Sequence, residues 1–225
     1  MRSASSLDAR SNRLRAALRR SLRTGLLAGL LGAGCCSCSL SGSGPRVSRE
    51  QAMAAPSAPF AEQAILVQVR ADARLNTAQG QAHSLVLGVL QAARADALVA
   101  LARHPEQVEQ ALVDAREAPG LLQLDRFVIL PGSRCVARVD RARGTLAVAL
   151  VAGYAHPGPG RVPRVFEIPL RLRSSGWLWR SYAASARSLR LRLRLGPSGV
   201  LAAEPLARKA AEQAALPACQ ALGEA

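Results

Sequence analysis

The side chains that most often perform catalysis or bind metals are few and scattered in this sequence. The three histidines, His83, His104 and His156, stand far apart, and no CxxC or HxxxH spacing is present. A metal site needs several such ligands around one ion. Ser133 and Ser198 follow tight turns and lack the strand–turn–helix setting of a serine nucleophile. The sequence therefore predicts a protein that is not an enzyme, with no metal site and no cofactor.

The five cysteines allow a different chemistry, covalent modification. Cys35, Cys36 and Cys38 follow a basic stretch at residues 1–23 and a short apolar stretch, TGLLAGLLGAG, at residues 24–34. This order is typical of a bacterial signal peptide. Because a cysteine directly follows small residues, the segment resembles a lipoprotein signal. That resemblance implies removal of residues 1–34 and acylation of Cys35, with Cys36 as the alternative.

The residues around the signal bear on export and sorting. The pair Arg19-Arg20 leaves both the general and the twin-arginine export routes open. In lipoproteins an aspartate after the acylated cysteine favours retention in the inner membrane, whereas Cys36 stands there in this chain. The resemblance thus implies a lipid anchor in the outer membrane, facing the periplasm. Residues 35–60 are rich in Ser, Gly, Pro and Ala, which predicts a lipidated flexible tether.

Composition bounds the remainder of the chain. The protein has 225 residues, of which 49% are hydrophobic, 3% aromatic and 20% charged, so it can bury a core but not one built from aromatic rings. No apolar run reaches the ~18 residues of a membrane-spanning helix. Residues 1–34 hold seven arginines and one aspartate, a net charge of 7 − 1 = +6, which leaves 15 − 6 = +9 on the rest. This excess is compatible with an anionic surface nearby.

Hydrophobic periodicity predicts a mostly β domain over residues 61–200. The run at 64–72 alternates, with Val67 and Val69 on one face, and the run at 84–91 is apolar on both faces. A short polar connection between them predicts a hairpin. Residues 92–118 change to a helical period that breaks at His104-Pro105, which predicts two short helices.

Further strands are expected at 122–130, 135–139, 145–154 and 164–170, the last at a sheet edge because Pro169 cannot donate to a ladder. Seven short strands and one helical insert favour a β-sandwich. Residues 201–225 are expected to form a C-terminal tail with a short helix and a loose end.

Two features leave alternatives open. Residues 189–195 alternate leucine and arginine, so Arg190, Arg192 and Arg194 share one face. They are either a stripe that binds polyanions such as lipopolysaccharide, or the solvated face of an edge strand. Cys135 and Cys219 could pair in an oxidising periplasm, but the sequence does not show that they approach each other.

The order of these features resembles the TssJ family, the outer-membrane lipoproteins of the type VI secretion system. The resemblance rests on Arg70–Asn76 after the first strand, on Leu85–Gln91, on the Leu-Pro-Gly turn at Leu130–Ser133 and on Tyr154 after an apolar strand. It spans roughly Gln63–Leu170. It implies a transthyretin-like β-sandwich with a short helical insert, preceded by the signal peptide and tether.

The resemblance also implies a function. TssJ-like proteins bind the periplasmic C-terminal region of the inner-membrane protein TssM and so anchor the secretion apparatus to the outer membrane. The family's contact element is the loop between the first two strands. By position it comprises Asn76, Thr77, Ala78, Gln79, Gly80, Gln81, Ala82 and His83. We expect this protein partner, with no nucleic acid and no small-molecule substrate; the alternative is a lipid-anchored basic module that binds polyanions.

Overall fold

The structure is a computed structural model that describes residues 46–114, 119–156, 162–177, 179–207 and 216–223. The chain divides into residues 1–43 and a compact unit from Gly44 to Ala225, and every described residue belongs to the second. The predicted signal peptide, Cys35 and the first part of the tether lie outside the described residues. No helix among the described residues is long and apolar enough to cross a membrane.

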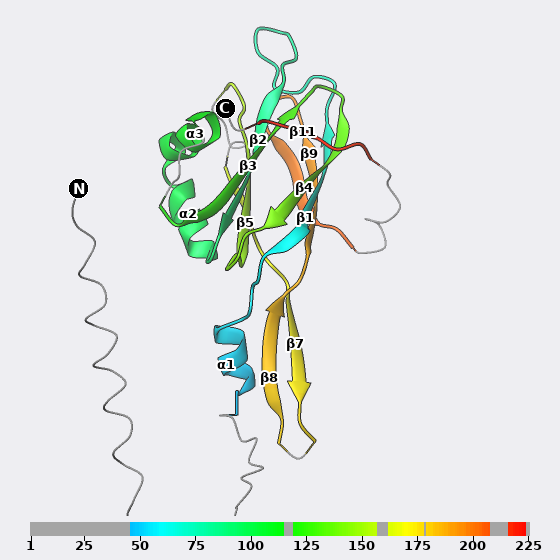
Figure 1. The fold of residues 1–225 in the computed structure, drawn as a ribbon. Helices are drawn as coiled ribbons and strands as arrows, with labels where there is room; N and C mark the ends of the chain where they lie inside the picture. Colours follow the sequence, from blue (N-terminus) through cyan, green and yellow to red (C-terminus); the bar gives the residue numbers. More distant parts are fainter. Residues whose placement is uncertain (1–45, 115–118, 157–161, 178, 208–215, 224–225) are drawn as a thin grey trace, which may run out of the picture. The chain divides into compact units, whose positions relative to one another are not determined.

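Two stacked sheets form the body of the unit (Figure 1). The first has four strands in the order β10-β9-β1-β4, with β9 parallel to β1 and the other neighbours antiparallel. Its strands are β1 (Ala61–Ala71), β4 (Arg134–Arg141), β9 (Leu189–Leu195) and β10 (Val200–Pro205).

The second sheet has five strands in the order β11-β3-β2-β5-β6, all antiparallel to their neighbours. Its strands are β2 (Leu85–Ala92), β3 (Leu121–Ile129), β5 (Ala147–Ala152), β6 (Arg164–Glu167) and β11 (Gln220–Ala221). β6 lies at the edge, as predicted from Pro169.

The core lies between the sheets. Val67 and Val69 of β1 face it, as their alternation predicts, and Leu191 of β9 joins them. Leu87 and Leu150 complete it from the opposite sheet. The predicted fold class, a mostly β sandwich, is confirmed.

The helical insert covers the outer face of the five-stranded sheet. It consists of α2 (Ala95–Ala102) and α3 (Pro105–Asp114), with the predicted break before Pro105. Leu98 and Leu112 of these helices bury Leu90 of β2 in a second apolar cluster. Gly88 allows this contact, because a Cβ atom there would collide with Leu112. This arrangement explains why β2 is apolar on both faces.

The predicted hairpin between the first two strands is wrong. β1 pairs with β4 and β9, while β2 pairs with β3 and β5, so residues 72–84 cross from one sheet to the other. The physical reason lies in their patterns: β1 keeps a polar face for solvent, whereas β2 must be covered on both sides.

The edge-strand interpretation of residues 189–195 and the loose C-terminal tail are also wrong. β9 is an interior strand because β10 pairs with its far side. Near the end of the chain, β11 pairs with β3. The expected helix falls partly on residues 208–215, outside the described residues. Leucines on the inner face of β9 give it enough apolar burial to sit inside the sheet.

The flexible tether predicted at residues 35–60 is too long, because part of this segment is folded. Residues 49–54 form a helix, α1 (Arg49–Ala54), that starts with a capping box in which Ser48 and Gln51 bond each other's backbone N–H. α1 packs against β8 (Ser181–Ala186), which forms a two-stranded hairpin with β7 (Leu170–Ser175). Backbone hydrogen bonds to this hairpin order the segment despite its loop-like composition.

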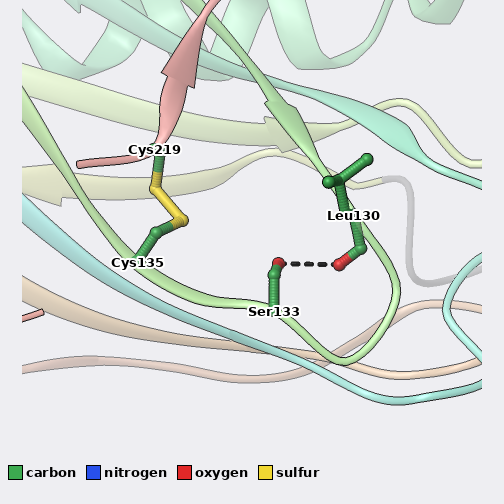
Figure 2. The surroundings of a disulfide bond; sticks show 4 residues. All are labelled: Leu130, Ser133, Cys135 and Cys219. Atoms are coloured by element: carbon green, nitrogen blue, oxygen red, sulfur yellow. Dashed lines mark hydrogen bonds between the residues drawn. A yellow bond between two sulfur atoms is a disulfide. The ribbon is translucent and has the colours of Figure 1, made fainter. Parts of the chain in front are cut away.

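Cys135 and Cys219 form a disulfide that closes 84 residues of chain (Figure 2). Around it, the backbone N–H of Cys219 donates to Val136 of β4, and β11 then pairs with β3. The C-terminal segment therefore bonds β4 of one sheet and β3 of the other, and the disulfide fixes it there. The sequence left open whether Cys135 and Cys219 pair, and the structure shows that they do.

Candidate partner-binding loop

The connection from β1 to β2 starts at a firmly held residue. The backbone N–H of Asp72 donates to Leu195 at 2.8 Å, and its carbonyl accepts from Gly132 at 2.9 Å. The Asp72 carboxylate accepts from the N–H of Arg74 at 2.8 Å. The loop therefore leaves the sandwich from a residue that is bonded to the end of β9 and to the turn between β3 and β4.

Asn76 holds the loop from inside. It is buried, and its backbone adopts a left-handed conformation with φ of 48°, which asparagine tolerates better than most residues. Its Nδ2 donates to the carbonyl of Ser84 at 3.0 Å, and its Oδ1 accepts from the N–H of Ala155 at 2.8 Å. Both ends of the Asn76 side chain, which was expected to belong to the contact loop, are therefore engaged inside the protein.

Leu75 and Thr77 complete the base. Leu75 is fully buried in the core between the sheets. The N–H of Thr77 donates to Pro197 at 2.8 Å, and its hydroxyl donates to the carbonyl of Arg74 at 2.6 Å. The base of the loop is thus anchored in the core by Leu75, and the hydrogen bonds of Thr77 fix the point from which the exposed tip begins.

The tip is a tight turn. Ala78 and Gln81 exchange two backbone hydrogen bonds of 2.9 and 3.0 Å. Between them, Gln79 and Gly80 both have positive φ, 52° and 77°, the pattern of a type I′ turn. The N–H of His83 then donates to Leu75 at 3.0 Å and closes the loop. Glycine at position 80 makes this turn possible.

The side chains of the tip are available to another molecule. Residues 79–83 are all exposed, and Ala78 is half-buried. Among the described residues, none forms a side-chain hydrogen bond with Gln79, Gln81 or His83. Two amides and an imidazole on a rigid turn can form directional hydrogen bonds with a protein surface.

The turn between β3 and β4 also lies next to the start of this loop, and the sequence analysis did not include it among the candidate contact residues. The turn at Leu130–Ser133 is closed by the Ser133 hydroxyl, which donates to the carbonyl of Leu130 at 2.7 Å (Figure 2). The N–H of Ala71 donates to Ser133, so this turn adjoins the start of the loop. Leu130 is 53% exposed. Its position directly after an apolar strand and before Pro-Gly was a signal for an exposed apolar side chain.

Two residues that carry the family resemblance lie inside the protein. Tyr154 is buried, its hydroxyl donates to the carbonyl of Gly196 at 3.2 Å, and burial raises its pKa to about 12. Gln91 is fully buried; its amide donates to Asp140, and its oxygen accepts from Ala142 and Thr145. Both join the five-stranded sheet to elements of the other sheet.

The histidines remain apart. His83 lies on the loop tip and His156 follows β5, while His104 contacts Glu106 at 3.3 Å on the exposed helical insert. In the part of the chain that the structure describes, no group of three or more potential metal ligands comes together.

A family model described as "Type VI secretion lipoprotein, VasD, EvfM, TssJ, VC_A0113" matches residues 63–195, more than half of the chain. The chain belongs to this family. It is thus a type VI secretion lipoprotein, and the family resemblance inferred from the sequence is confirmed. The family is a structural component of the secretion system and not a known enzyme family, and its lipoprotein character implies association with a membrane.

Solved structures to which the chain is similar include the lipoprotein TssJ1 from Pseudomonas aeruginosa, at 19% identity and a TM-score of 0.45, covering 68% of this chain and 98% of that one. The membrane-bound type VI component Lip from Serratia marcescens matches at 17% identity and a TM-score of 0.45, covering 64% and 96%. No curated protein matches the chain.

Proposed function

We propose that this protein anchors the type VI secretion membrane complex to the outer membrane. In this proposal, acylated Cys35 holds the chain in the periplasmic leaflet. The folded unit then binds the periplasmic C-terminal region of a TssM-like inner-membrane protein. The role is structural and involves no catalysis, nucleic acid or small-molecule substrate.

The observation that carries the proposal is the contrast within the loop at residues 76–83. Asn76 and Thr77 are bonded to the rest of the protein, whereas residues 79–83 are exposed on a fixed turn. A loop held by a rigid scaffold is a common place for recognition, since little conformational entropy is lost on binding. The family membership supplies the secretion context.

We assign the contact to the exposed tip, residues 79–83, and a positioning role to Asn76 and Thr77. The turn at Leu130–Ser133, which is bonded to Ala71 and Asp72 where the loop begins, adds one exposed apolar side chain, Leu130. A polar turn beside an exposed leucine fits a modest interface with a polar rim and a small apolar centre.

The test is co-purification from detergent-solubilised envelopes. A tip variant replaces Gln79 with Asn and Gln81 and His83 with Ser, so that the turn and the Asn76 contacts remain. We expect it to fold normally and to lose the large inner-membrane partner that the parent captures. Arg143→Ser, at an exposed position on the β4–β5 turn, is the matched control.

Asn76→Ala serves as a second variant because it removes two internal hydrogen bonds without touching the tip. It should weaken both stability and capture, and a capture defect that follows the melting temperature identifies positioning. Undiminished capture by the tip variant would overturn the assignment of the loop. If the parent itself captures no inner-membrane protein, the anchoring role is wrong.

One observation favours the second candidate, polyanion binding. Arg70, Arg134, Arg192 and Arg194 line a pocket of about 510 Å³ on the outer face of the four-stranded sheet, and no carboxylate lines it. Such a site should bind lipopolysaccharide with a steep dependence on salt concentration. Binding unaffected by Arg70→Ser would remove this candidate.

A further inference from the structure

The hairpin of β7 and β8 carries the protein's only two tryptophans at its tip. Trp177 is 94% exposed and Trp179 62% exposed, the first being the most exposed large apolar side chain among the described residues. Indole rings are amphipathic and gather at the boundary between membrane and water. Burying both in the protein's own core is impossible at a hairpin tip, so their exposure calls for another partner.

The beginning of the folded unit lies at this same tip. The Arg46 guanidinium stands over the Trp179 ring at 3.9 Å, and the backbone of Val47 bonds Ser181 and Tyr182. The chain then runs along the hairpin through α1 until Ser57 pairs with Ser185. Residue 46 is therefore held beside Trp179 at the hairpin tip.

The distance to the proposed lipid anchor is short. Arg46 lies eleven positions after Cys35 in the chain, and eleven fully extended residues span at most about 40 Å. With Cys35 acylated, the hairpin tip is kept within that distance of the bilayer. This step rests on the membrane attachment in the proposed function.

The charge of the hairpin suits an anionic surface. Residues 170–187 contain four arginines and neither aspartate nor glutamate. Three of these arginines, Arg171, Arg173 and Arg187, line a pocket of about 500 Å³ together with Arg190 of β9, and no carboxylate lines it. Arg190 Nε is buried without a hydrogen-bond acceptor among the described residues. A phosphate oxygen is the acceptor that such a guanidinium cluster binds best.

We propose that the β7–β8 hairpin is a second membrane anchor, with Trp177 and Trp179 inserted at the interface of a phospholipid bilayer and Arg171, Arg173 and Arg190 bound to lipid phosphates. An acyl chain combined with a basic surface holds a protein on a membrane far better than either alone. The hairpin thereby orients the sandwich relative to the membrane, which a lipid on a tether cannot do.

The test uses tryptophan fluorescence, which reports on the hairpin tip alone because the protein has no other tryptophan. The full chain with Cys35 and Cys36 replaced by serine cannot be acylated at either position and is mixed with vesicles of phosphatidylcholine containing phosphatidylglycerol. We expect a blue shift of the emission and quenching by lipids brominated on their acyl chains. Pure phosphatidylcholine should give a weaker response, and Arg171→Ser/Arg173→Ser should remove the difference.

Vesicle flotation measures the contribution of the indoles. Burying ~60 Å² of one ring corresponds to about tenfold in partition, so Trp177→Ser/Trp179→Ser should reduce it by roughly a hundredfold. The matched control is Val113→Ser/Leu201→Ser, which removes two other exposed apolar side chains. An equal loss in this control would overturn the assignment to the hairpin.

Three other outcomes would also overturn the proposal. The emission could stay unchanged with vesicles for both the acylated and the unacylated protein. Inorganic phosphate could displace the protein more than chloride of equal ionic strength, which would identify a free phosphate as the ligand. The tryptophans could respond only to an inner-membrane partner protein, which would identify a protein contact. Partner capture by the loop is measured separately, so a failure there leaves the hairpin result intact.

Discussion

The two sheets share one core and present opposite outer faces. In the four-stranded sheet, β9 alternates buried leucines with outer-face arginines, of which Arg192 and Arg194 are exposed and Arg190 is half-buried. In the five-stranded sheet, all six residues of β5 are buried, because helices α2 and α3 cover the outer side. The same backbone geometry thus serves two environments, and only the alternation of side chains distinguishes them.

This difference separates two roles. The covered sheet contributes stability, with apolar groups on both sides of β2 and β5. The open sheet contributes a charged surface and supports the loop at residues 72–84, which is bonded at Leu195 and Pro197. A charge should therefore be costly on one outer face and nearly neutral on the other.

Leu90→Arg gives the largest expected effect. Leu90 lies on the outer face of β2, 1% exposed beneath the helices, and an unpaired charge there should lower the free energy of unfolding by about 3–5 kcal/mol. Leu201→Arg, at a 59% exposed position on β10, should change it by less than about 0.5 kcal/mol. Urea denaturation of both variants measures the contrast, and equal losses would show that the two faces do not differ in burial.

Removal of the disulfide gives the next largest effect. Cys135→Ser/Cys219→Ser opens a link across 84 residues and frees the segment that bonds both sheets. The free energy of unfolding should fall by about 2–4 kcal/mol. Thermal unfolding with and without reductant checks this, and the double variant must be insensitive to the reductant. A parent protein whose two cysteines label as free thiols after denaturation would contradict the bond itself.

Much of this division was readable in the sequence. Alternation in residues 64–72 and 189–195 predicted half-buried strands, and the run at 84–91 was predicted to be apolar on both faces. The break at His104-Pro105 predicted two helices. These features depend on side-chain period, which local sequence records directly.

Strand partners were not readable in the same way. The pairing of β1 with β9 joins residues more than a hundred positions apart, and no local pattern specifies it. The loop at 76–83 was predicted by resemblance, but burial of Asn76 depends on Ala155, which only the fold brings near. The hairpin of residues 170–186 was not resolved from the sequence either, because its partner α1 lies in a segment with the composition of a tether.

Tyr154→Phe should have a smaller effect that depends on pH. The lost hydrogen bond to Gly196 should lower stability by about 1 kcal/mol at neutral pH. Since burial raises the Tyr154 pKa to about 12, the native parent keeps a proton that the unfolded chain releases above about pH 10. Parent stability should therefore fall as pH rises from about 10 to 12, and the variant should fall less steeply. Urea midpoints across this range decide it; parallel curves would contradict the role of the hydroxyl.

The smallest predicted effect concerns the charged face. Arg134, Arg70 and Arg194 are neighbours across β4, β1 and β9, all exposed on the same outer face. The structure gives none of the three an ion pair with a described carboxylate. Like charges placed opposite each other destabilise a sheet by a few tenths of a kcal/mol.

Arg70→Ser should therefore leave the protein as stable as the parent or raise its stability by up to about 0.5 kcal/mol at low salt. Added salt should stabilise the parent more than the variant, because salt screens the repulsion among the three arginines and the variant lacks one of them. Melting temperatures over a salt series measure this, with Arg143→Ser as the control for net charge. A clear loss of stability in Arg70→Ser would mean that the row is held by attractive contacts and is part of the framework. A gain would mean that the open sheet keeps a repulsive arrangement that folding does not require, which is the property expected of a surface that binds anions.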